Sequence, residues 1–243
     1  TGIICQSSLQ IILFLKIYIM KLVKSIKYLN RILDRYRSDG FKIHLTPTMG
    51  ALHAGHLKLV KRSKKIKSIV VVSIFVNPTQ FGPKEDYKDY PRTLKNDLKV
   101  LKKYGADIVF TPIQKQILSH KTKHNCPQFA IEKRLCGKSR PNYFPGVKNI
   151  VLKLFDIVQP DAAFFGEKDY QQYLVIKKMT ESLKLNTRIK CVKTVRDRNG
   201  LPLSSRNNYL SGQEFKIAIK INKLLKKLPP LIRTKLKINK ILN

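Results

Sequence analysis

One stretch organises the chain: Thr46-Pro47-Thr48-Met49-Gly50-Ala51-Leu52-His53-Ala54-Gly55-His56-Leu57. It lies where a short apolar strand, residues 42–45, would lead into a helix that begins near Gly55. His53 and His56 are three residues apart, so their imidazoles share one face of the helix's first turn. Backbone N–H groups and the helix dipole attract phosphate there, and two histidines would add charge-assisted hydrogen bonds. The alternative is a pair of ordinary helix histidines.

Polar residues also follow other predicted strands, each at the strand's carboxyl end. Asn77 and Gln80 come at the end of the apolar run 69–76, and Gly166 to Asp169 follow the run 162–165. In parallel sheets, ligands bind in the crevice at the carboxyl ends of the strands. These segments are therefore predicted to converge on the same crevice as the two histidines.

The side chains in these segments suit a nucleotide and an organic acid. Lys168 can neutralise an α-phosphate in a pentavalent transition state, and Asp169 can accept hydrogen bonds from ribose hydroxyls. Gln80 and Gln172 carry neutral amides that both donate and accept, which suits a substrate with hydroxyls and a carboxylate. The alternative is a surface ion pair for the two charges and a solvated face for the glutamines.

Strands and helices alternate along the chain from residue 20. Apolar residues in 22–36 step by three and four, which predicts an amphipathic helix, and the run 69–76 is typical of a strand buried in a parallel sheet. Further strands are expected at 42–45, 107–111, 162–165 and 188–195, and further helices at 55–67, 93–104, 147–157 and after Tyr170. This alternation predicts an α/β fold with a doubly wound, mostly parallel sheet.

The composition indicates a globular protein with a large positive charge. Of 243 residues, 43% are hydrophobic, and the formal net charge is +34. The charge is spread over the whole chain without a DNA- or RNA-binding motif, so we attribute it to codon bias and expect no nucleic-acid partner. The cysteines lack the spacing of a zinc site or a C-x-x-C pair, which favours the reducing cytoplasm. They are Cys5, Cys126, Cys136 and Cys191.

The two ends of the chain differ from its middle. Residues 1–19 hold an apolar run that is too short to span a bilayer and is broken by Lys16, so no membrane segment is expected. We interpret these residues as a non-native extension before a start at Met20, with a membrane-surface anchor as the alternative. A nucleotide-binding domain is predicted over residues 20–194, and a second, smaller domain over residues 195–243.

The motif blocks resemble those of the pantoate–β-alanine ligase (pantothenate synthetase) family, a relative of the class I aminoacyl-tRNA synthetases and other HxGH nucleotidyltransferases. They match in order at residues 47–56, 72–81, 165–172 and 203–207. The resemblance implies a Rossmann-like nucleotidyltransferase domain in a cytoplasmic homodimer. It also implies that residues 195–243 are a truncated form of the family's small C-terminal α/β lid domain.

The resemblance implies a reaction in two steps. Pantoate reacts with ATP and magnesium to give a pantoyl adenylate and pyrophosphate, and the amine of β-alanine then displaces AMP. The product is pantothenate, which serves coenzyme A synthesis. The family is thus one of AMP-forming ligases that make a carbon–nitrogen bond.

The resemblance also implies roles for individual residues. His56, His53 and Lys168 are the implied catalytic residues, and His56 matches the residue usually assigned as proton donor to the leaving phosphate. Gln80 and Gln172 match the pantoate contacts, and Gln80 also faces β-alanine. The implied ATP-binding positions are Met49, Gly50, Ala51, Leu52, His53, Ala54, Gly55, His56, Gly166, Glu167, Lys168, Asp169, Val195, Leu203, Ser204, Ser205 and Arg206. Asp97 is a candidate for a place near the magnesium.

Two departures from the family pattern keep alternatives open. Tyr143 stands where the family usually has histidine, which weakens any proton-accepting role at that position. The short C-terminal part is compatible with a decaying relative that binds ATP with little turnover, or with a basic nucleic-acid-binding protein on the same fold. Another HxGH enzyme, such as a pantetheine-phosphate adenylyltransferase, is disfavoured by Asn77 with Gln80 and by Lys168 with Gln172.

Overall fold

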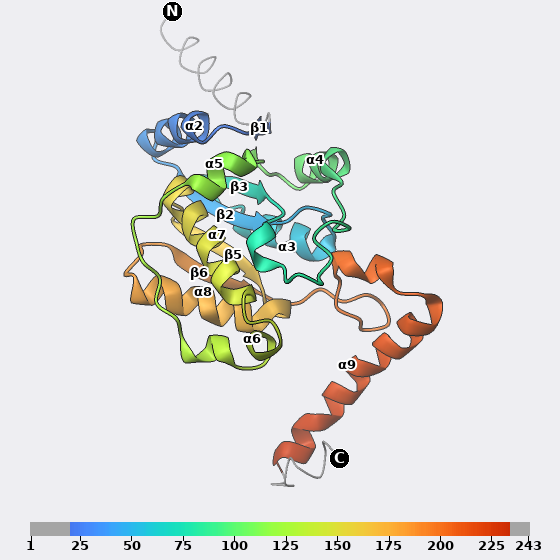
Figure 1. The fold of residues 1–243 in the computed structure, drawn as a ribbon. Coiled ribbons are helices and arrows are strands. Elements are labelled where there is room, and N and C mark those ends of the chain that lie inside the picture. Colours follow the sequence, from blue (N-terminus) through green and yellow to red (C-terminus); the bar gives the residue numbers. More distant parts are fainter. Residues whose placement is uncertain (1–19, 234–243) are drawn as a thin grey trace, which may run out of the picture.

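A sheet of six parallel strands forms the centre of the fold. The structure, a computed structural model, describes residues 20–233. The strand order is β1-β4-β3-β2-β5-β6, and every neighbouring pair is parallel (Figure 1). The strands are β1 (Lys21–Val23), β2 (Lys42–Thr48), β3 (Ser68–Ile74), β4 (Ile108–Phe110), β5 (Ala162–Gly166) and β6 (Arg188–Val192). The predicted parallel α/β sheet is confirmed.

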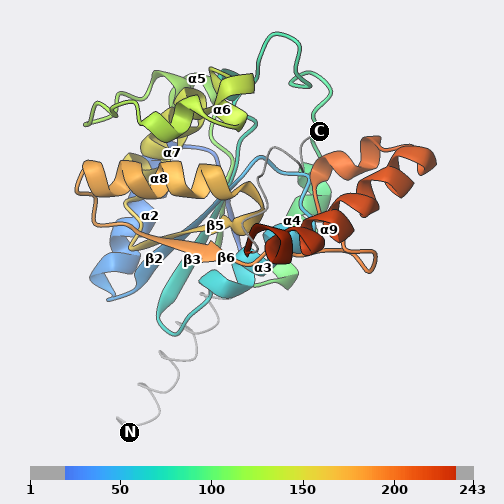
Figure 2. The ribbon, with the colours of Figure 1, turned by 90° about the horizontal axis from the view of Figure 1, so that it is seen from below.

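Helices cover both faces of this sheet, so the fold is doubly wound (Figure 2). On one face pack α2 (Ile26–Ser38), α7 (Tyr143–Val158) and α8 (Tyr170–Ser182). On the other pack α3 (Ala54–Ser63) and α4 (Leu94–Lys103). Shorter elements are α5 (Gln114–Ser119), α6 (Cys136–Ser139) and the 3-10 turns η1 (Pro78–Gln80), η2 (Ala130–Lys133), η3 (Glu167–Asp169) and η4 (Ser205–Tyr209).

Successive side chains of the central strand β3 point to opposite faces of the sheet and pack into two separate hydrophobic cores. Ile69 and Val71 pack into the core beneath α2, α7 and α8. Val70 and Val72 point the other way and pack with α3 and α4. All four are completely buried. Because both faces are covered, the strand has a continuous apolar sequence without polar alternation.

The first predicted helix is wrong at its start. Residues 21–23 form β1, which pairs with β4, and α2 begins at Ile26 after Ser25, whose Oγ accepts the Tyr28 backbone N–H. An edge strand of three residues is too short to show an alternating pattern in the sequence. Leu22 is exposed and lies four residues before Ile26, so the spacing of these two residues resembles that of a helix.

The helix predicted at 147–157 begins four residues earlier than expected, at Tyr143. A proline and a glycine, Pro145 and Gly146, lie in its first turn, and these residues weaken a helix signal in sequence. A proline there is tolerated in the structure because first-turn N–H groups have no intrahelical partner. The earlier start brings Tyr143 into the helix's first turn.

Beyond β6 the chain forms an arm that ends in α9 (Gly212–Arg233), a helix that extends away from the sheet (Figure 1). A capping box starts this helix: Ser211 N–H donates to Glu214 Oε2 at 2.8 Å, and Glu214 N–H donates to Ser211 Oγ at 3.3 Å. Among residues 20–233, no helix is both long and apolar enough to cross a membrane. The domain boundaries stay a prediction, and the interpretations of residues 1–19 and 234–243 lie outside the described residues.

α7 packs directly against the turn η1. A Cβ on Gly146 would lie 2.3 Å from the carbonyl oxygen of Thr79, so a glycine is needed for this approach. The Asn77 Nδ2 donates to the Gly146 carbonyl oxygen at 3.1 Å across the same contact. The contact sets the position of Gln80, the last residue of η1.

Gly146→Ala should destabilise the protein by about 1–3 kcal/mol, because the added methyl group forces η1 away from α7. Urea denaturation followed by circular dichroism measures the free energy of unfolding. Gly212→Ala is the matched control, since a Cβ there meets nothing within 4 Å. Equal stability of the two variants would contradict a close-packed contact between α7 and η1.

Candidate functional site

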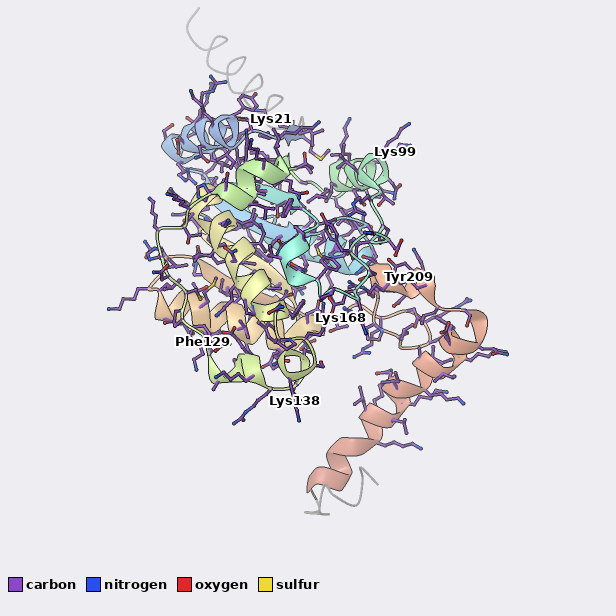
Figure 3. The ribbon with its side chains drawn as sticks, in the orientation of Figure 1. Lys21, Lys99, Phe129, Lys138, Lys168 and Tyr209 are labelled. Atoms are coloured by element: carbon purple, nitrogen blue, oxygen red, sulfur yellow. The ribbon has the colours of Figure 1, made fainter. Side chains whose placement is uncertain are left out.

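The carboxyl ends of β2, β3, β5 and β6 border one crevice. Residues 49–57 follow β2, Asn77 and Gln80 follow β3, and residues 166–169 begin at the last residue of β5. Residues 203–206 reach the crevice from beyond β6. In Figure 3, Lys168 lies between the sheet and the segment that carries Tyr209. Segments far apart in sequence therefore meet where the parallel-sheet rule places ligands.

Most of the predicted site residues line this crevice. They are Met49, His53, Gly55, His56, Gln80, Gly166, Lys168, Asp169, Gln172, Val195, Leu203, Ser204, Ser205 and Arg206. The predicted residues that are not part of this lining are Gly50, Ala51, Leu52, Ala54, Asp97 and Glu167. Glu167, for example, accepts the backbone N–H of Thr194 at 3.1 Å. A motif pattern marks the whole loop, and only the backbone path separates residues that face the crevice from residues that support it.

Backbone hydrogen bonds orient both histidines. His53 is the N-cap of α3, and its Nδ1 accepts the N–H of Gly55 at 3.1 Å. The Nδ1 of His56 accepts the N–H of His53 at 3.4 Å, and the ring centroids are 4.1 Å apart. Because each Nδ1 is an acceptor, the proton of each neutral ring is on Nε2. The two rings thus offer neighbouring Nε2–H donors.

The ring of His53 lies in the space that a side chain at Gly55 would occupy. A Cβ at this position would lie 2.7 Å from Cε1 and 2.8 Å from Nδ1 of His53. The imidazole therefore folds back over the glycine backbone to cap the helix. This contact is a physical reason for a glycine between the two histidines of an HxGH motif.

Both imidazoles are neutral at pH 7 in this structure. Desolvation, followed by the positive charges of His53 and Lys168, lowers the pKa of His56 to about 3. Desolvation and then Lys168 also lower the pKa of His53, against an opposing effect of Asp169. The free protein therefore offers neutral N–H donors, and the charge-assisted hydrogen bonds expected with a leaving pyrophosphate stay a prediction. A bound anion would raise both pKa values.

Asp97 braces the loop that leads into α3. Asp97 is only 1% exposed. Its Oδ2 accepts the backbone N–H of Ala51 at 3.0 Å, and its Oδ1 accepts that of Leu52 at 2.9 Å. Gly50 and Ala51 have φ angles of 84° and 49°, a left-handed turn that aims both N–H groups at the carboxylate. These contacts give Asp97 a structural role in the loop before α3, and its place near magnesium stays a prediction. Residues 20–233 contain no group of three or more His, Cys, Asp or Glu side chains arranged to hold a metal.

Lys168 and Asp169 are both at the crevice and paired with each other. Their side chains form an ion pair at 3.1 Å and are 36% and 52% exposed. Such an exposed pair contributes little to stability, so the lysine can exchange this partner for a phosphate at little cost. Lys168 and Asp169 therefore form an exposed ion pair, as the alternative held, and they also lie at the crevice where a nucleotide site was predicted.

The segment 203–206 is held against the other crevice loops. Ser205 Oγ donates to the Ala51 carbonyl oxygen at 3.0 Å, which joins it to the HxGH loop. Arg206 makes a two-point contact with Asp86 at 2.8 and 2.7 Å, and its guanidinium lies 5.2 Å from the Tyr90 ring centroid. Arg206 holds the pKa of the Asp86 carboxyl below its usual value. This cation is thus at the crevice wall and engaged with a carboxylate.

The two glutamines are held through their amide oxygens. Gln80 Oε1 accepts from Asn77 Nδ2 at 3.2 Å, and its Nε2 has only the weak acceptor Met49 Sδ, at 3.1 Å. Gln172 Oε1 accepts the Tyr143 hydroxyl at 2.9 Å. Each glutamine therefore has an amide NH₂ group left to donate.

Several charged or polar residues of the crevice lining were not among the predicted site residues, namely Tyr90, Arg140, Tyr143, Lys193 and Thr194. Lys193 follows β6, so the rule that ligands bind at carboxyl ends of strands could have identified it. Arg140 precedes α7 and Tyr143 is its first residue; no spacing pattern marks them as site residues, although Tyr143 stands out as a departure from the family pattern. Arg140 donates to Glu85 Oε2 at 2.6 Å and lies 4.0 Å from the Tyr143 ring centroid.

The geometry defines the class of protein. A parallel sheet carries two histidines at the N-terminus of the helix after β2, and a lysine follows β5 across the same crevice. Phosphate binding at a helix N-terminus beside fixed N–H donors is the arrangement of an HxGH-type nucleotidyltransferase fold.

Comparison with known proteins identifies the family. The sequence model described as "Pantoate-beta-alanine ligase" matches residues 21–241. The pantothenate synthetase of Buchnera aphidicola subsp. Acyrthosiphon pisum (strain Tuc7) is 47% identical over 210 residues, which are 86% of this chain and 74% of that protein. The chain belongs to the pantoate–β-alanine ligase family, and it is a ligase of the class that forms carbon–nitrogen bonds.

Two solved structures agree with this assignment. Pantothenate synthetase from Thermus thermophilus superposes with a TM-score of 0.78 at 40% identity, over 84% of this chain and 72% of that one. Pantoate–β-alanine ligase from Francisella tularensis, complexed with β-γ ATP and β-alanine, superposes with a TM-score of 0.77 at 41% identity, over 86% and 80%. The sequence-based recognition and fold class are confirmed.

Proton titration should find His56 neutral over the physiological range. With a pKa of about 3, its imidazole resonances should not shift between pH 8 and pH 5 in the free protein. The unfolded chain takes up a proton near pH 6.5, so this histidine should make the fold progressively less stable as pH falls from about 6.5 towards 3. Two-dimensional NMR, with His56→Ala to assign the signal, measures the titration. A midpoint near pH 6.5 would contradict the neutral donor.

Asp97→Asn should weaken ATP binding about tenfold. The carboxylate accepts two backbone N–H groups, whereas an amide has one acceptor oxygen, so the loop before α3 should be held less firmly. Calorimetry with ATP at several magnesium concentrations measures the dissociation constant. Asp34→Asn removes the same charge from the exposed surface of α2 and should leave binding unchanged. If Asp97→Asn needs more magnesium to bind ATP while the loop before α3 stays as stable as in the unaltered chain, Asp97 is instead a metal ligand.

Proposed function

We propose that this crevice joins pantoate to β-alanine with ATP, through a pantoyl adenylate. The observation that supports this most is the division of the crevice into two adjoining halves. One half offers phosphate donors at the start of α3, and the other offers the amide NH₂ groups of Gln80 and Gln172. A reaction between a nucleotide and an organic acid needs both halves side by side.

The phosphate half would bind ATP at the N-terminus of α3. The Nε2–H groups of His53 and His56 donate to phosphate oxygens, and Lys168 leaves Asp169 to neutralise the α-phosphate. The charge that develops on the leaving pyrophosphate raises the pKa of His56 and strengthens the hydrogen bond that its Nε2–H donates to the phosphate oxygens. Met49, Gly55 and the residues at 50–52 shape the backbone around the nucleotide.

The second wall of the nucleotide site would come from two further segments. Gly166 and Val195 lie at the carboxyl ends of β5 and β6, where the base and ribose fit. Leu203 to Arg206 close over the triphosphate, and Arg206 exchanges Asp86 for phosphate oxygens. This exchange replaces one charged partner by another, so the guanidinium of Arg206 stays paired throughout.

The acid half would hold pantoate between the two glutamines, with Gln80 also contacting β-alanine. A carboxylate oxygen of pantoate attacks the α-phosphorus, and the bond to pyrophosphate breaks. The neutral amine of β-alanine then attacks the acyl carbon, loses a proton, and displaces AMP. Positioning and exclusion of water supply most of the catalysis, because the mixed anhydride is readily hydrolysed.

Magnesium, a homodimeric state and a cytoplasmic location complete the proposal, and family membership supports them. Magnesium usually keeps several waters and binds through substrate phosphates, so it would accompany ATP. Its protein contacts would be few here, since Asp97 is engaged by backbone N–H groups and Asp86 by Arg206.

The full 243-residue chain should release AMP and pyrophosphate over many turnovers only when ATP, magnesium, pantoate and β-alanine are all present. Coupled spectrophotometric assays for the two products measure this. His56→Ala should lower turnover by about 10²-fold or more, because a hydrogen-bond and proton donor to the leaving group is lost. His124→Ala, outside the crevice lining, is the control.

Two other results would contradict the proposed activity. Pyrophosphate release limited to one per site, or none with ATP binding retained, would identify a remnant without turnover and would refute the proposed activity. Binding of DNA or RNA with steep salt dependence, in a chain inert towards pantoate, would favour the nucleic-acid alternative.

A further inference from the structure

Tyr143 occupies a distinctive place on the acid side of the crevice. It is the first residue of α7, and its hydroxyl donates to Gln172 Oε1 at 2.9 Å. The guanidinium of Arg140 lies over its ring, 4.0 Å from the centroid. Tyr143 thus links the start of α7 to a glutamine on α8.

The surrounding contacts hold this hydroxyl in one position. The first turn of α7 is fixed against η1 by the close approach of Gly146 to Thr79 and by the hydrogen bond from Asn77. Arg140, which covers the ring, is itself held by a two-point ion pair with Glu85. A donor on such a support orients its acceptor more strictly than a solvated side chain does.

The hydroxyl keeps its proton at every physiological pH. Desolvation raises the pKa of Tyr143 to about 12, although the charge of Arg140 opposes this effect. The cation over the ring also polarises the O–H bond, which makes it a better donor. Among the described residues, Gln172 Oε1 is the acceptor that this hydroxyl reaches.

An oriented glutamine is chemically different from a free one. An unrestrained amide can rotate by about 180° and present either its oxygen or its NH₂ group at nearly the same position. If the Gln172 amide rotated, its Nε2 would donate to the Tyr143 hydroxyl oxygen, and the desolvated O–H proton would lose the acceptor that it has in Oε1. The NH₂ group of Gln172 is then committed as a pair of donors.

We propose that Tyr143 is a positioning residue that sets the amide of Gln172 to donate, and so selects substrates that present acceptor oxygens at this wall. The inference rests on the proposed function, in which Gln172 contacts pantoate. The ligand group it favours is a carboxylate or hydroxyl oxygen, and it disfavours an ammonium group. Gln80 is set in the same sense by Asn77, so both walls of the acid half present donors.

Tyr143→Phe tests this proposal, because it removes the hydroxyl and keeps the ring beneath Arg140. KM for pantoate should rise about fivefold, the effect of one neutral hydrogen bond, while KM for ATP and kcat stay within about twofold. Tyr143→His restores an N–H donor and should recover most of the lost affinity. Tyr173→Phe, on α8 beside Gln172, is the control: its ring packs against the core, and its hydroxyl makes no hydrogen bond within residues 20–233.

Calorimetric titration of pantoate into the full chain separates this inference from the proposed function. If the unaltered chain binds and converts pantoate but Tyr143→Phe shows the same KM and dissociation constant, the positioning role alone is refuted. A loss shared equally by ATP and pantoate, or a lower melting temperature without a change specific to pantoate, also refutes it. If the unaltered chain neither binds nor converts pantoate, the proposed function fails and this inference with it.

Discussion

The buried carboxylate of Asp97 is the interaction on which the site depends. It accepts two backbone N–H groups of a left-handed turn, at Ala51 and Leu52, and thereby fixes where the chain leaves β2 and where α3 begins. The capping imidazole of His53 and the ring of His56 follow directly from that starting point. The buried carboxylate is stable here because backbone donors satisfy both oxygens, so one residue of α4 sets the geometry of the proposed phosphate site, which it does not line.

The charges around the crevice are more nearly neutralised than those of the whole chain. The net charge is +34, yet three cations around the crevice are paired with carboxylates: Lys168 with Asp169, Arg206 with Asp86, and Arg140 with Glu85. The histidines are neutral because desolvation and neighbouring cations oppose their protonation. The free protein therefore holds donors in place without concentrating charge, and an arriving anion can exchange with the carboxylates.

The fold was predictable where a pattern is repeated over many residues. The buried run of β3 and the helices that follow each strand establish the parallel sheet, and the rule for ligands at carboxyl ends then locates the crevice. The same reasoning failed at β1, where three residues carry no period, and at Tyr143, where a proline and a glycine obscure the start of α7. Short elements owe their structure to partners distant in sequence, and no local signal records those partners.

The sequence by itself determined the class of fold, the family and most of the residues around the crevice, because motif spacing and strand order are properties of the chain. Only the tertiary structure decided how each of these residues acts. It showed neutral imidazoles with protons on Nε2, Asp97 as a brace, and Arg140 and Tyr143 beside Gln172. These features depend on desolvation and on hydrogen-bond partners brought together from separate elements, and neither is encoded in residue type or spacing.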